Sequence, residues 1–121
     1  MKTLVIIIFL TILISIGAVA YLTLSERESN SFENYQSVVE SGLIARGWVP
    51  SFIPKSAYNI NEHHRVDEPN IFVELNFSPK DIIFFEKACD LLKHNIYKCN
   101  NSGNPVIVKI TNKNHVTIES I

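Results

Sequence analysis

A long uncharged segment at the start of the chain limits where the rest can fold. No charged residue lies between Lys2 and Glu26, and 14 of the 21 residues from 4 to 24 are Leu, Ile, Val or Phe. As a helix, this segment would be about 31 Å long, which matches a hydrocarbon core of about 30 Å. It has no polar stripe for a solvent face, which disfavours a helix buried in a soluble domain. We therefore expect residues 1–24 to be a transmembrane anchor or a signal segment.

Cleavage as a signal peptide is the main alternative to an uncleaved anchor. Lys2 forms a minimal basic start, residues 4–16 an apolar centre, and residues 18–20 (Ala-Val-Ala) have the small-x-small form of a cleavage site. The apolar run continues to Leu24, and Tyr21 suits a membrane interface, so we favour the anchor. The prediction is a single-pass protein with its C-terminal domain outside the cytoplasm, in the periplasm or at the cell surface. Cleavage after Ala20 would make the domain secreted.

The remaining residues predict a polar linker over 25–30 and one small α+β domain over 31–121. Helical spacing of apolar residues and capping residues predict helices over 32–46 and 79–93. The second helix would turn four side chains toward the sheet, namely those of Ile82, Phe85, Cys89 and Leu92. Alternating patterns predict strands over 57–62, 70–77, 106–111 and 115–120. The expected fold is two helices on one face of a mostly antiparallel four-stranded sheet.

Residues 47–54 carry two prolines four positions apart, which forbids a helix and disfavours a central strand. The same stretch is too apolar to remain in solvent, since it contains Trp48, Val49, Phe52 and Ile53. We expect an irregular segment that fills the space between sheet and helices. An aromatic recognition surface at Trp48 and Phe52 is the alternative.

Two cysteines, Cys89 and Cys99, lie ten residues apart in the predicted domain. Outside the cytoplasm such a pair favours a disulfide, which for so short a loop would contribute about 2–3 kcal/mol in the chain-entropy model. Two unpaired thiols are the alternative, with Cys89 a small core residue. Two cysteines alone do not make a zinc site.

Candidate acid–base or metal-ligating groups gather only at Glu62, His63, His64, Asp67 and Glu68. Their spacing is that of neither a zinc protease nor a calcium loop, and adjacent histidines on a strand point to opposite faces. We favour a solvated loop with a structural His–Asp hydrogen bond, and we expect no metal, cofactor or catalytic residue. A slightly acidic domain without a basic cluster disfavours nucleic acid. No small-molecule substrate is inferred.

Several of these residues together resemble the YbbD head domain family. The likeness is carried by residues 47–50 (Gly-Trp-Val-Pro) and 53–57 (Ile-Pro-Lys-Ser-Ala), by the strand ending at Phe77, and by Ile60, Glu62, His64 and Asp67. Residues 68–70 (Glu-Pro-Asn) stand where the family tends to have a shorter turn. The resemblance implies a small bacterial domain that often follows a hydrophobic N-terminal segment and has no assigned activity.

These observations favour a non-catalytic protein-binding module of the bacterial envelope. Its contacts would be with an envelope protein, through a sheet face or through Trp48, Phe52, His64 and Asp67. An immunity-type inhibitor of an envelope-acting toxin is the alternative, since small size and export suit both. A metal-dependent enzyme at Glu62, His64 and Asp67 is the lesser alternative.

The anchor prediction is tested by the intact mass of the chain in the membrane fraction. We expect the mass of all 121 residues, because the apolar run extends past the cleavage site. A chain that begins at Tyr21 would show that the segment is a cleaved signal peptide.

Overall fold

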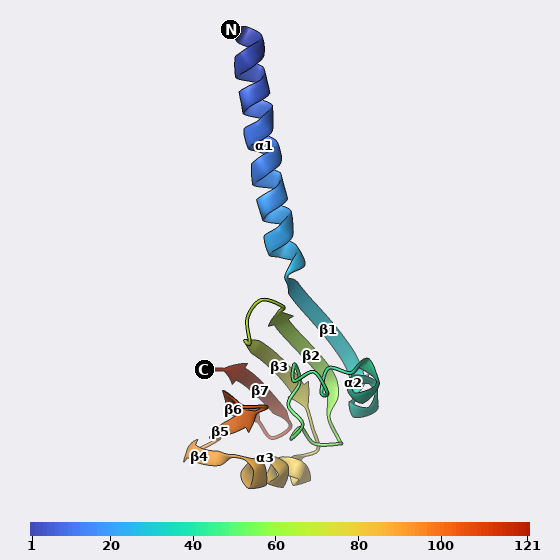
Figure 1. Ribbon diagram of the computed structural model, residues 1–121. Helices are drawn as coiled ribbons and strands as arrows, with labels where there is room; N and C mark the ends of the chain where they lie inside the picture. The colour runs from blue at the N-terminus through green and yellow to red at the C-terminus, as the bar shows by residue number, and fades with distance from the viewer.

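The computed structural model describes residues 1–121, apart from the side chain of Ser25. Its first element is the helix α1 (Lys2–Ser25), which projects away from the rest of the molecule (Figure 1). No part of the apolar stretch of α1 is buried against the domain. The helix is long and apolar enough to cross a membrane, a property that signal sequences share. Only Glu26 separates α1 from the first strand.

One antiparallel sheet of seven strands forms the domain, in the order β1-β2-β3-β7-β6-β5-β4. The strands are β1 (Arg27–Asn34), β2 (Tyr58–Arg65), β3 (Ile71–Asn76), β4 (Asp90–Lys93), β5 (Ile96–Asn101), β6 (Asn104–Asn112) and β7 (His115–Ser120). After β3 the chain crosses to the far edge through η1 (Pro79–Ile82) and α3 (Ile83–Ala88). It then returns as a meander that ends beside β3. The α+β class is confirmed, but the predicted four-stranded sheet is too small.

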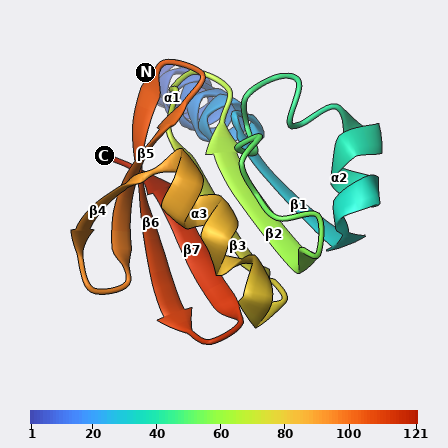
Figure 2. The same cartoon turned by 90° about the horizontal axis from the view of Figure 1, so that it is seen from below.

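One face of the sheet carries the core because apolar residues alternate along its central strands. Val73, Leu75, Val108, Val116 and Ile118 are fully buried, as the alternation predicts. They join a single cluster with Val38 of α2 (Tyr35–Ser41), Val49 and Ile53 of the 42–57 loop, and Phe85 of α3. Figure 2 shows α2, α3 and this loop around the sheet. The other face of the sheet is left without a covering layer.

The predicted helix over 32–46 is confirmed only in its middle, as α2, because the chain is a strand as far as Asn34. β1 also includes residues 27–30, which the sequence assigned to the linker. Its side chains are mostly polar and exposed, so no apolar alternation marks it as a strand. The short α2 begins where the Asn34 side chain accepts a hydrogen bond from the Ser37 amide (3.0 Å). It ends at Gly42, whose φ of +78° is left-handed.

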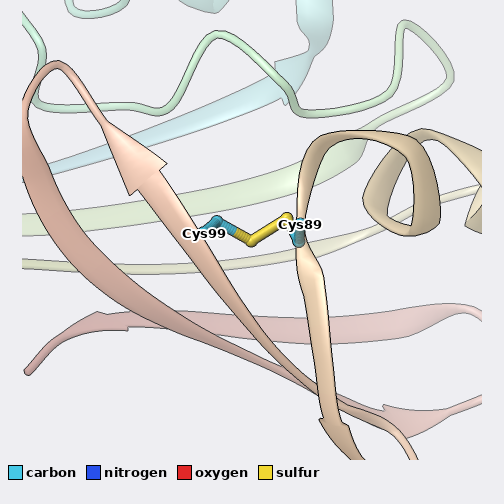
Figure 3. Close-up of a disulfide and its surroundings, with 2 residues drawn as sticks. All are labelled: Cys89 and Cys99. Carbon is cyan, nitrogen blue, oxygen red and sulfur yellow. A yellow bond between two sulfur atoms is a disulfide. The ribbon is translucent and has the colours of Figure 1, made fainter.

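The predicted helix over 79–93 is also too long, and the disulfide explains why. The structure joins Cys89 to Cys99, as the sequence predicted, with their Cα atoms 4.4 Å apart (Figure 3). Cys99 lies within β5, and Cys89 is extended, so α3 ends at Ala88 and β4 follows. Ile82 and Cys89 pack against the core as expected, but Leu92 is 56% exposed.

Candidate functional site

The aromatic residues of the 47–54 segment are used for packing. Val49 and Ile53 are buried, and Phe52 makes an edge-on contact with Phe85, with ring centroids 6.3 Å apart. Trp48 stacks on His64, with ring centroids 3.9 Å apart and planes 13° from parallel. The expectation of an irregular but packed segment is confirmed.

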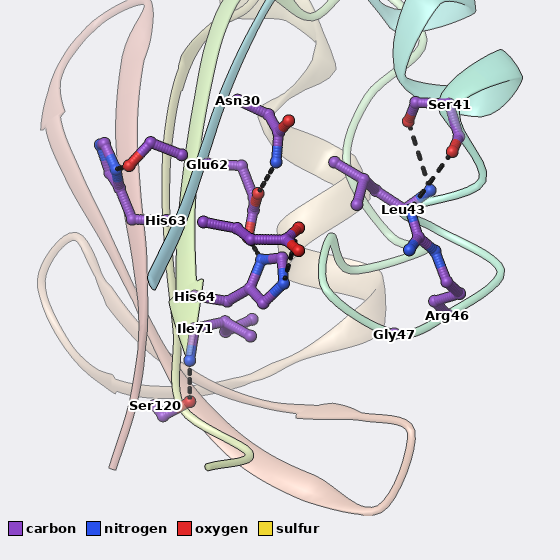
Figure 4. Close-up of polar contacts among 12 residues, drawn as sticks. Asn30, Ser41, Leu43, Arg46, Gly47, Glu62, His63, His64, Ile71 and Ser120 are labelled. Atoms are coloured by element: carbon purple, nitrogen blue, oxygen red, sulfur yellow. Dashed lines mark hydrogen bonds and ion pairs between the residues drawn. The ribbon is translucent and has the colours of Figure 1, made fainter. Parts of the chain in front are cut away.

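Trp48 and His64 lie beside a buried carboxylate, that of Glu62 on β2. The Glu62 side chain is completely inaccessible to solvent. Its Oε2 accepts a hydrogen bond from Asn30 Nδ2 (2.9 Å), and its Oε1 lies 2.5 Å from His64 Nδ1 (Figure 4). On the other side of the ring, His64 Nε2 lies 3.4 Å from Glu28 Oε2. We call Glu28, Asn30, Glu62, His64 and Trp48 the buried network after its two buried members, Glu62 and His64; the side chain of Glu28 is 49% exposed.

The buried network solves an electrostatic problem, since a buried carboxylate is costly unless it is paired and hydrogen-bonded. His64 has a carboxylate oxygen against each ring nitrogen. The two carboxylate oxygens and the stacked face of Trp48 hold the ring in one position. The arrangement therefore joins β1, β2 and the 42–57 loop by hydrogen bonding and stacking.

The predicted His–Asp hydrogen bond is wrong, because Asp67 bonds to Arg65, and His63 and His64 bond to Ser29 and Glu62. Arg65 donates through Nε to Oδ1 (2.9 Å) and through Nη2 to Oδ2 (2.7 Å). These bonds lower the pKa of the Asp67 carboxyl below its ordinary value, and the same contact raises the pKa of Arg65. Arg65 Nη2 also lies 3.3 Å from Glu26 Oε2, and its Nε lies 3.8 Å from Glu68 Oε1. Asp67 thus belongs to an exposed ion-pair group at the β2–β3 turn.

His63 points to the opposite side of β2 from His64, as strand geometry requires. Its Nδ1 lies 2.7 Å from Ser29 Oγ, and its ring lies 6.1 Å from that of Phe72. The five residues that form a cluster in the sequence therefore divide among two sheet faces and a turn. Among the described residues, no group of three or more His, Cys, Asp or Glu side chains is placed to hold a metal ion.

The uncovered face of the sheet gives residues to the sheet-face contact that the sequence left unassigned. Its polar side chains bond across strands: Ser31 Oγ donates to Asn61 Oδ1 (2.8 Å), and Asn61 Nδ2 donates to Glu74 Oε1 (3.2 Å). Farther along, Lys109 Nζ pairs with Glu119 Oε1 (2.5 Å). A pocket of about 400 Å³ lies where β1, β2 and β3 end near α1, lined by Arg27, Glu28, Ser29, His63, His64, Arg65, Asn70 and Phe72. In the sequence, this face is indicated by the polar residues that alternate with Val73 and Leu75 along β3.

Residues 26–76 match the family model of the YbbD head domain. We call this stretch the YbbD head segment. It begins at the residue before β1 and ends with β3, so it contains the whole buried network and the Arg65–Asp67 pair. The resemblance carried by residues 47–77 is thereby confirmed and extends back to β1. No curated protein and no solved structure shows a significant match to the chain.

Both cysteines and four of the seven strands lie beyond the YbbD head segment. The two parts still share one sheet, through the pairing of β3 with β7. They are also joined where Asn101 Nδ2 donates to the Gly47 carbonyl oxygen (2.8 Å). The YbbD head segment is therefore one side of a continuous domain.

The Arg65–Asp67 pair predicts a specific pH dependence. The folded-state pKa of Asp67 is lowered from 3.8, so the stability that the pair contributes is present above that value. This contribution is lost as the pH falls through the lowered pKa. In Arg65→Gln the Asp67 pKa should return toward 3.8, as followed by NMR titration of its carboxyl carbon. The exposed Arg46→Gln is the control, and an unchanged Asp67 pKa in Arg65→Gln would contradict the assignment.

Proposed function

We propose that the chain is a membrane-tethered, non-catalytic protein-binding module of the bacterial envelope, with its domain outside the cytoplasm. We further propose that the uncovered face of the sheet is its contact surface. The proposal rests on the position of the core: α2, the 42–57 loop and α3 pack against the inward side chains of the sheet, on one face only.

The uncovered face has the properties of a binding surface. Cross-strand bonds hold its side chains in place, which reduces the ordering cost of association. Three half-buried apolar side chains lie among them, those of Phe72, Ile96 and Ile107. Apolar anchors within a polar surround are typical of protein interfaces.

The buried network supports a non-catalytic role. A general acid or base must come within hydrogen-bond reach of its substrate. Glu62 has no exposed side-chain surface, His64 has 1%, and each is already bonded to neighbours within the fold. The Trp48–Ile53 segment is less suited than the sheet face to recognition, since its aromatic rings stack internally.

Site-specific photo-crosslinking in intact cells tests the contact surface. A photoreactive residue at Thr117, near the middle of the uncovered face, should capture one envelope protein. The same residue at the exposed Glu40 of α2 is the matched control and should not capture it. Thr117→Arg, which puts a bulky charge on this face, should weaken co-purification of that protein without changing the melting temperature.

Equal capture from both positions, or capture from Glu40 alone, would contradict the assignment of the sheet face. If the captured protein is a toxin and expression of the chain protects cells from it, the module is of the immunity type.

A further inference from the structure

We infer that the β2–β3 turn is a second membrane contact, with Val66 in the lipid headgroup layer. The partner is the lipid of the bilayer that α1 crosses, so this inference rests on the proposed retention of the anchor. It adds a surface of the folded domain to the contact made by the helix.

A backbone hydrogen bond fixes the position of the turn relative to α1. The Val66 amide donates to the Glu26 carbonyl oxygen (2.8 Å), and Arg65 pairs with Arg27 across the strands. Glu26 immediately follows α1. Figure 1 shows the β2–β3 turn at the end of the domain nearest the helix. Val66 therefore lies at the same level as Glu26, the first residue after α1.

The length of α1 places that level inside the headgroup layer. The 23 residues from Lys2 to Leu24 span about 34 Å at 1.5 Å per residue, against a hydrocarbon core of about 30 Å and a full bilayer of about 40–45 Å. Glu26 is two residues beyond Leu24, a further rise of about 3 Å. A helix centred in the bilayer thus holds Glu26, and Val66 beside it, among the headgroups.

The side chains of the turn suit this location. Val66 is 58% exposed, although it is apolar. A single exposed valine is ordinary on a soluble surface, and the bond to Glu26 is what distinguishes this one. Arg27 is exposed as well and has no ion-pair partner in the described part of the chain. An arginine at this depth can donate to lipid phosphates.

The charges near the turn determine which lipid it fits. Arg65 is already paired with Asp67, Glu26 and Glu68, so this group has more negative than positive charges. Anionic lipid would therefore not increase the affinity of this surface for the membrane. We therefore expect the contact to form on zwitterionic lipid and to be no stronger when anionic lipid is added.

Quenching by brominated lipid tests the position of Val66. The full chain is reconstituted in phosphatidylcholine vesicles brominated near the top of the acyl chains. Val66→Trp should lose a larger share of its added emission than a tryptophan remote from the membrane, because its side chain lies among the headgroups next to the brominated layer. Val39→Trp is the matched control, since Val39 is an exposed valine on α2, away from α1. The parent chain gives the baseline of Trp48.

Vesicle flotation separates failure of this inference from failure of the anchor. Chains that float, with no more quenching in Val66→Trp than in Val39→Trp, would overturn the membrane contact and leave the anchor in place. Chains that do not float would overturn both. If Val66→Trp lowers the melting temperature, Glu68→Trp in the same exposed turn takes its place. An increase in quenching when anionic lipid is added would overturn the expected lipid preference.

Discussion

The pairing of Glu62 with His64 is the interaction on which the half of the domain formed by β1, β2 and β3 depends. Glu62 points into the core side of β2, where an unpaired carboxylate would oppose folding. Asn30 and Glu28 reach the pair from β1, and Trp48 reaches it from the 42–57 loop. A polar edge strand and an irregular loop, neither of which has strong intrinsic order, are thereby held on the sheet.

The part of the chain that matches the family model and the part beyond it contain different stabilising contacts. The YbbD head segment contains the complete buried network, while the stabilising disulfide lies in the part that it does not cover. The two halves of the sheet are thus held by different means: a buried Glu62–His64 hydrogen bond and aromatic stacking on one side, and a covalent bond on the other. In both halves the outward side chains remain available for contacts.

The sequence predicted those parts of the fold that depend on apolar alternation. Val73, Leu75, Val116 and Ile118 lie where the period of two places them, and the cysteines pair as expected. β1 was missed because its polar side chains bond to β2 rather than to a core. β4 was missed because the disulfide imposes an extended Cys89 on a sequence with helical spacing.

For the site, the sequence identified the right cluster, but only the register of β1 shows that His64 turns to Glu62 and Glu28.

Trp48→Ala tests most directly whether the buried network is structural. Urea denaturation of the full chain should show a loss of about 3 kcal/mol in the free energy of unfolding, because a stacked aromatic side chain is removed from the core. Phe84→Ala, which removes an aromatic ring that is 46% exposed, should cost much less. A Trp48→Ala chain as stable as the parent that no longer captures the partner would contradict the account, since Trp48 would then serve recognition.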